Sequence, residues 1–64
     1  MKEKRIEEFI EWAREKAKAC PQLKNEINDY VQWAIDEIEE GASVSHEIQL
    51  CMSEINELIN ENCN

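Results

Sequence analysis

Residues 20–44, CPQLKNEINDYVQWAIDEIEEGASV, decide the fold of this chain, because they contain its only proline and its only glycine. Proline disfavours helical geometry in the residue before it and is common at the first position of a helix. One helix is therefore expected to end near Cys20 and another to begin at Pro21. Gly41 follows an acidic run, as a left-handed helix cap would. These two breaks predict three helices, at about residues 2–19, 21–40 and 44–62.

Hydrophobic residues recur at helical spacing in all three segments. The stripes are Ile6, Phe9, Ile10, Ala13 and Ala17, then Leu23, Ile27, Tyr30, Val31, Ala34 and Ile38, then Val44, Ile48, Cys51, Met52, Ile55 and Ile59. Because the connections are short, neighbouring helices should be antiparallel, with Ser43 or Ser45 capping the third. The pattern predicts an all-α fold, a small up-down-up three-helix bundle that makes residues 1–64 a single helical domain. The alternative is one helix kinked at Pro21, which would form a long bent rod that must dimerise.

The length of the chain limits the stability that its core can provide, and its cysteines indicate the redox state of the compartment in which it works. A domain of 64 residues usually obtains only about 3 to 5 kcal/mol of net stability from its own core. We expect neither a signal peptide nor a membrane span, because the start is rich in charge. The three cysteines have no CxxC spacing, which favours reduced thiols and a cytoplasmic location. Cys20 and Cys63 would meet at one end of the bundle and could pair under oxidation, whereas Cys51 belongs to the core.

The charge is distributed unevenly along the chain. All seven Lys and Arg residues lie within the first 24 positions, whereas ten of the fifteen carboxylates follow them, and the net charge is −8. Such a charge disfavours direct binding to DNA, RNA or anionic lipid, each of which would repel it. The predicted partner is instead a basic protein surface, which would supply the counter-charge that residues 25–64 lack.

A helical wheel places many of these carboxylates beside large hydrophobic side chains. In the second helix Trp33 falls outside the core-facing arc and has acidic residues three and four positions away. In the third helix Leu50 falls on the outer side, again among carboxylates. Both helices also end in acidic residues, which opposes the helix dipole and suggests a functional demand. The candidate partner-binding residues are Asp29, Trp33, Asp36, Glu37, Glu40, Glu47, Leu50, Glu54 and Glu57.

The first helix carries a related pattern with mixed charge. Residues 6–13, IEEFIEWA, resemble residues 27–34, INDYVQWA, at a separation of 21 positions. A similar pattern is expected of any two amphipathic helices with aromatic edges. Trp12 lies beside Glu8, Glu15 and Lys16, and surface pairs are expected between Lys4 and Glu8, Glu11 and Arg14, and Glu15 and Lys18. The first helix therefore has the pattern of an ordinary solvated face.

No catalytic, metal or cofactor pattern is present. The only possible zinc ligands of the Cys and His type are Cys20, Cys51, Cys63 and His46. His46 begins the third helix and Cys63 ends it, about 25 Å away at 1.5 Å per residue, so one ion cannot reach both. Gly41 alone cannot form a phosphate-binding loop. We expect no enzyme, no metal and no cofactor.

These features predict a non-enzymatic, acidic protein-protein interaction module. In size, charge and helicity the chain resembles the small acidic helical inhibitors that bacteriophages use against host nucleases or CRISPR complexes. That resemblance implies an inhibitor that covers a nucleic-acid-binding surface of a host protein, with carboxylates in place of phosphates. The alternatives are a structural homo-oligomerisation module, with a homodimer as its simplest form, and a helical adaptor whose groove accepts an amphipathic helix.

Overall fold

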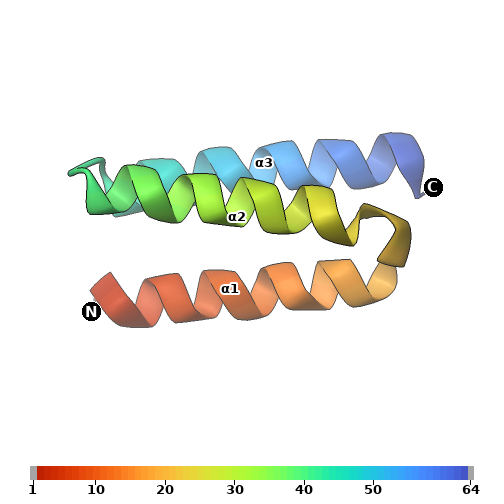
Figure 1. Ribbon diagram of the computed structural model, residues 1–64, viewed down its shortest axis with the longest axis horizontal. Coiled ribbons are helices and arrows are strands. Elements are labelled where there is room, and N and C mark those ends of the chain that lie inside the picture. The colour runs from red at the N-terminus through yellow and green to blue at the C-terminus, as the bar shows by residue number, and fades with distance from the viewer. Residues whose placement is uncertain (1, 64) are drawn as a thin grey trace.

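The computed structural model describes residues 2–63, and Figure 1 shows three antiparallel helices. They are α1 at Lys2–Ala19, α2 at Lys24–Glu39 and α3 at Val44–Asn62, with a short 3-10 helix, η1, at Pro21–Leu23. No strand is present among residues 2–63. The predicted all-α, up-down-up three-helix bundle is confirmed.

The chain reverses direction between α1 and α2 at Cys20 and Pro21. Cys20 leaves helical geometry, with φ −136° and ψ 74°, and Pro21 opens η1. The Leu23 N–H donates to the Cys20 carbonyl over 3.0 Å, which closes a tight turn and directs the Leu23 side chain into the core. This turn makes α2 begin at Lys24, three residues later than predicted. It also excludes a continuous kinked helix, because α1 and α2 pack along each other.

A glycine cap and a serine cap form the connection between α2 and α3. Gly41 has a φ of 110°, which an L side chain rarely adopts. Its N–H donates to the Ile38 carbonyl and the Ala42 N–H donates to the Glu37 carbonyl, each over 3.0 Å. This pair of bonds ends α2 as a Schellman motif, one residue before the predicted end. Ser43 then caps α3 by accepting a hydrogen bond from the His46 N–H over 3.4 Å.

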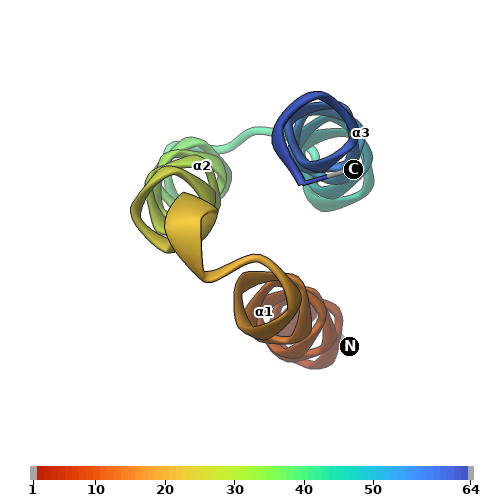
Figure 2. The ribbon, with the colours of Figure 1, turned by 90° about the vertical axis from the view of Figure 1, so that its right-hand side faces the viewer.

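The core is a column of small and branched side chains enclosed by the three helices. The end view in Figure 2 shows α1, α2 and α3 at the corners of a triangle. The buried hydrophobic residues are Phe9, Ala13, Cys20, Leu23, Ile27, Ala34, Ile38, Ile48, Cys51 and Ile55. Cys51 is in the core, as predicted. None of the helices within residues 2–63 combines the length and the apolar composition that crossing a membrane requires.

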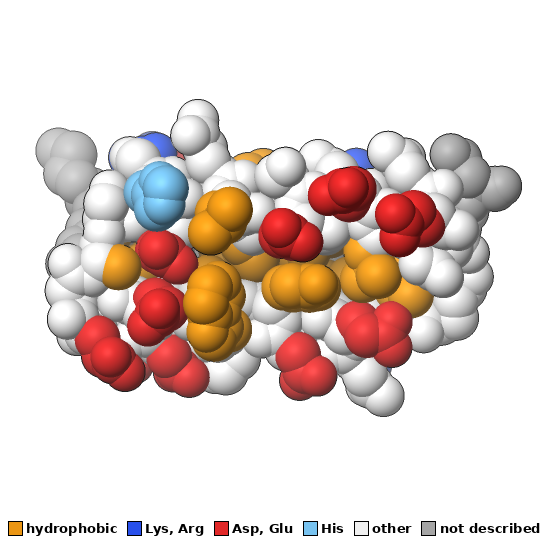
Figure 3. Space-filling view, turned by 90° about the horizontal axis from the view of Figure 1, so that it is seen from above, with side chains coloured by type: hydrophobic (Ala, Val, Ile, Leu, Met, Phe, Trp, Pro, Cys, Tyr) orange, Lys and Arg blue, Asp and Glu red, His pale blue; other side chains and the backbone are white. Residues whose placement is uncertain are grey.

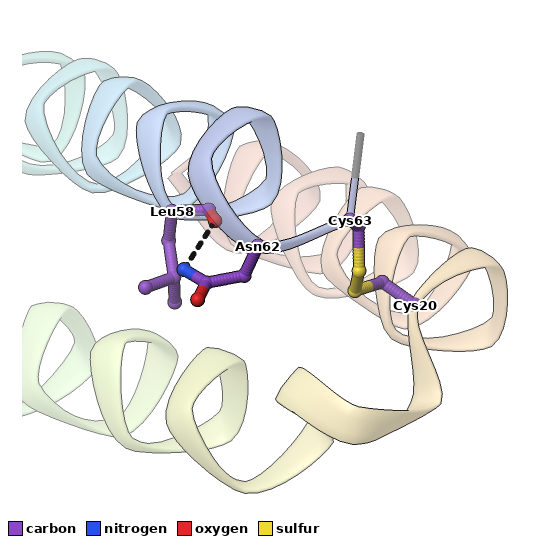
Figure 4. Close-up of a disulfide and its surroundings, with 4 residues drawn as sticks. All are labelled: Cys20, Leu58, Asn62 and Cys63. Atoms are coloured by element: carbon purple, nitrogen blue, oxygen red, sulfur yellow. Dashed lines mark hydrogen bonds between the residues drawn. A yellow bond between two sulfur atoms is a disulfide. The ribbon is translucent and has the colours of Figure 1, made fainter.

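A disulfide joins Cys20 at the end of α1 to Cys63 at the end of α3, as Figure 4 shows. The predicted meeting of Cys20 and Cys63 at one end of the bundle is confirmed, and the two cysteines are paired, although reduced thiols were the favoured state. The physical reason is the matched length of the helices, which brings the two ends together and leaves the two Cα atoms 6.2 Å apart. Cys51 remains a free, buried cysteine.

Candidate functional site

A groove of about 560 Å³ lies along the contact between α2 and α3. We call it the acidic groove, and its lining residues are Glu26, Asp29, Tyr30, Trp33, Leu50, Cys51 and Glu54. Trp33 is 51% exposed and Leu50 is 39% exposed, and they are the two large hydrophobic side chains that the described surface presents to solvent. The groove therefore combines an accessible apolar surface with three carboxylates.

Helical spacing explains why these residues share one seam. Glu26, Tyr30 and Trp33 follow one another at intervals of four and three residues, so they lie on one side of α2. On α3, Leu50 and Glu54 are four residues apart and occupy one side in the same way. The antiparallel packing of α2 on α3 then places both sets along a common line.

Figure 3 looks onto this seam and shows hydrophobic side chains along the middle of the face, with Asp and Glu on both sides. Among the lining residues, Glu26 and Asp29 form the rim on α2, and Glu54 forms the rim on α3. None of the lining residues is basic. The negative charge of both rims is therefore not neutralised within the groove.

Glu47 lies in the first turn of α3 and differs from its predicted position. The helical wheel placed it on the outer face with Glu54 and Glu57, but its side chain is only 8% exposed. It lies four residues before the buried Cys51, so α3 carries it toward the inside of the bundle. Its Oε1 atom is buried and has no hydrogen-bond partner among the described residues. A buried, unpaired carboxylate oxygen is costly for a folded protein.

Cys51 forms part of the floor of the acidic groove. Burial, and to a smaller extent the negative charges of Glu47 and Glu54, together raise the pKa of its thiol to about 11. The thiol is consequently protonated at neutral pH and is a poor nucleophile.

The structure brings together four of the nine predicted site residues, Asp29, Trp33, Leu50 and Glu54. Asp36 and Glu37 lie farther along α2, and Glu40 directly follows its last residue, next to the turn at Gly41. Glu57 lies three residues after Glu54 on α3. These four extend the acidic surface without lining the groove. The Asp36 carboxylate accepts a hydrogen bond from Gln32 over 3.1 Å.

Three lining residues were missed by the sequence interpretation. Tyr30 and Cys51 were assigned wholly to the core, and Glu26 was not selected, although all three line the groove. The spacing of Glu26, Tyr30 and Trp33 was a usable signal, because residues four and seven positions apart share a helix face. Cys51 carried no such signal. It is buried, and it lines the groove only because α2 and α3 pack side by side there.

The tryptophan of α1 is covered by neighbouring side chains of its own helix. Trp12 is half-buried, its ring stacks on Phe9 with centroids 6.4 Å apart, and the Lys16 ammonium nitrogen lies 5.5 Å from its ring centroid. Glu11 and Arg14 form the one ion pair found among the described residues, at 3.5 Å and well exposed. The predicted pairs of Lys4 with Glu8 and of Glu15 with Lys18 are not formed within that part of the chain.

The chemistry available to the acidic groove is recognition by charge and apolar contact. Within residues 2–63, no group of three or more His, Cys, Asp or Glu side chains is arranged to hold a metal ion. The groove offers carboxylate acceptors, two aromatic rings and an exposed leucine, which together suit a ligand that is both cationic and apolar. Comparison with known proteins finds no matching family, no matching curated protein and no matching solved structure.

Proposed function

We propose that the protein is a non-enzymatic interaction module that binds a basic surface of another protein through the acidic groove. The observation that carries this proposal is the coincidence of the two exposed large hydrophobic residues, Trp33 and Leu50, with carboxylates on both rims of one groove. A solvated face would disperse such hydrophobic residues and would intersperse both signs of charge.

The two kinds of side chain have separate tasks in this proposal. Trp33 provides most of the apolar area that can be buried, and tryptophan is among the residues that most often dominate binding energy at interfaces. The carboxylates attract Lys and Arg during the approach of the partner and pair with them once it is bound. Asp36, Glu37, Glu40 and Glu57 lengthen the surface over which this attraction acts.

The more specific form of the proposal is inhibition by nucleic-acid mimicry. A basic surface that normally holds phosphates would instead be covered by the carboxylates of α2 and α3. We retain the predicted cytoplasmic location as part of this proposal. Cys20 is only 1% exposed and Cys63 is half-buried, so cytoplasmic thiols would reach the disulfide from the Cys63 side.

Of the two alternatives, the helical adaptor has more structural support than the homo-oligomerisation module. A helical adaptor needs an open apolar cleft, and the acidic groove supplies one. Self-association through the same groove would bring two sets of carboxylates together, which repel. A homodimer would therefore have to use another face, and Trp12, the other tryptophan, is already packed against Phe9 and Lys16.

The test is affinity capture from an extract of the native host with three forms of the protein. These are the wild type, the reversal of Asp29, Asp36 and Glu37 to Lys, and the matched reversal of Glu7, Glu8 and Glu15 on α1 to Lys. Both triple variants change the net charge equally. We expect the wild type and the α1 variant to retain a basic, nucleic-acid-binding protein that added nucleic acid displaces, and the α2 variant to lose it.

Two outcomes would contradict the proposal. Equal retention of the partner by the α2 variant would show that the acidic surface of α2 is not the contact. Recovery of the chain alone, together with a dimer in sedimentation at micromolar concentration, would favour the self-assembly alternative. Circular dichroism of each variant establishes that the comparison is made between folded proteins.

A further inference from the structure

The cross-section of the acidic groove restricts what can occupy it. Its floor is apolar, with Trp33 and Leu50 as the exposed residues, and its two rims are acidic. A complementary occupant has an apolar stripe flanked by positive charge on both sides. This arrangement is that of an amphipathic basic helix, in which apolar residues recur every three or four positions between rows of Lys and Arg.

The length of the groove agrees with a helix. Along α2 the lining runs from Glu26 to Trp33, seven residues on, which is about 10 Å at 1.5 Å per residue. Two turns of a docked helix, at about 5.4 Å each, cover the same distance. A helical occupant would therefore contact the groove through apolar residues at positions i, i+4 and i+7 of its own sequence.

The walls of the groove disfavour an extended occupant. Both walls are α-helices, whose backbone N–H and C=O groups are already bonded within each helix, so the groove has no sheet edge to pair with. An extended segment would leave its own backbone groups without partners there. A helix satisfies those groups internally and presents only side chains.

Two further observations indicate a cationic ligand. At Trp12 the ring is covered by Lys16, four residues later, whereas the residue four positions after Trp33 is Glu37. The Trp33 ring thus has no such cation within its own helix. The carboxylates of Glu26, Asp29 and Glu54 likewise have no basic residue beside them in the groove lining, which is a second unmet demand for a cation.

We infer that the acidic groove takes a basic amphipathic helix of a partner protein. Its apolar residues contact Trp33 and Leu50, and its Lys and Arg residues on either side face Glu26 and Asp29 on one rim and Glu54 on the other. This inference rests on the proposed function, because it uses the same surface, and it names the partner element that the surface recognises.

The test uses the full chain and two synthetic peptides of about 14 residues, a length at which a free helix is marginal. One peptide places Leu at positions i, i+4 and i+7 with Lys on both sides. The other has the same composition with Leu and Lys rearranged to alternate. Because neither peptide contains Trp, the W12F variant reports the emission of Trp33 alone. Circular dichroism reports helix formation by the peptide.

We expect the amphipathic peptide to shift Trp33 emission to shorter wavelength and to gain helicity on binding. The rearranged peptide should bind at least about tenfold more weakly, since its apolar and basic residues do not segregate on a helix. The D29K/E54K variant, which reverses one carboxylate on each rim, should lose binding of the amphipathic peptide. The matched E8K/E15K variant on α1 should retain it.

Equal binding of the two peptides would overturn the inference, because charge alone would then explain the contact. Absence of binding by the amphipathic peptide would overturn it as well. In either case the host-protein capture with the α2 and α1 charge reversals judges the proposed function separately. A partner retained there in a charge-dependent way would show that the function stands and that its contact is not a helix.

Discussion

Trp12 and Trp33 occupy equivalent positions in two copies of one sequence pattern, yet their surroundings differ. Trp12 is half-buried against Phe9 and lies under the Lys16 ammonium. Trp33 is 51% exposed and lies in a groove with carboxylates on both rims. The hydrophobic spacing of α1 and α2 is the same, so the spacing does not account for the difference.

Charge and neighbouring helices account for it. The residue four positions after Trp12 is Lys16, which covers the ring, and the residue four positions after Trp33 is Glu37, which cannot act in this way. In addition, α3 presents Leu50 beside Trp33 and so lengthens the exposed apolar surface. The Trp12 ring is therefore covered by a cation of its own helix, and the Trp33 ring is exposed to solvent.

Reduction of the disulfide should have the largest effect, because it lowers the stability of the helical bundle that positions both tryptophans. The Cys20–Cys63 bond links positions separated by 43 residues, and a loop of that size corresponds to about 4 kcal/mol of stabilisation in the chain-entropy view. We expect the C20S/C63S variant to unfold at much lower urea concentration than the wild type. The C51A variant should keep its sensitivity to reductant. Equal urea midpoints for oxidised and reduced wild type would contradict this role.

Raising the pH titrates the Cys51 thiol on the floor of the acidic groove. Because the folded-state pKa of Cys51 is raised from 9.0 to about 11, its contribution to stability is fully present below pH 9. That contribution is lost as the pH rises toward 11, and two pKa units correspond to about 3 kcal/mol at most. The difference in unfolding free energy between wild type and C51A should shrink or change sign over this interval. A constant difference from pH 8 to pH 11 would contradict it.

Truncating each tryptophan separates stability from binding. W12A removes packing against Phe9 and the contact with Lys16, so we expect a loss of about 2 kcal/mol in unfolding free energy. W33A should change stability by less than about 1 kcal/mol, because the side chain is half exposed. It should nevertheless weaken binding of the partner or of the amphipathic peptide by about 2 kcal/mol, roughly 30-fold. Urea unfolding and fluorescence titration measure the two quantities. Similar effects of both variants on binding would remove the distinction between the two regions.

The bundle itself could be predicted because its signals are local. Pro21, Gly41 and the apolar spacing located the three helices, and α3 has the predicted bounds. The start of α2 was misplaced because the turn at Cys20 tightens into η1, which depends on burial of Leu23. A proline signal marks a break but does not specify how many residues the reversal consumes.

The site could be predicted only in part, because it depends on how two helices pack. The wheel of α2 correctly placed Trp33 and Asp29 outward, since that placement needs one helix alone. The burial of Glu47 could have been read from its position four residues before Cys51, whereas the place of Cys51 on the groove floor depends on how α3 packs against α2. The meeting of Cys20 and Cys63 was predicted from the bundle geometry, whereas reduced thiols were expected from the number and spacing of the cysteines alone.

Exchanging one pair of charges is the smallest and most selective test of the comparison. In the K16E/E37K variant the net charge is unchanged, but the cation moves from the Trp12 helix turn to the equivalent turn after Trp33. A lysine at residue 37 has the same four-residue spacing that places Lys16 5.5 Å from the Trp12 ring centroid. We expect acrylamide to quench Trp33 less and Trp12 more, measured in W12F and W33F backgrounds. Binding at the groove should weaken by about 0.5 to 1 kcal/mol, because the partner's cation meets one already in place. Since the total charge is constant, unchanged binding would mean that net charge alone governs recognition and that the open face of Trp33 has no part in it.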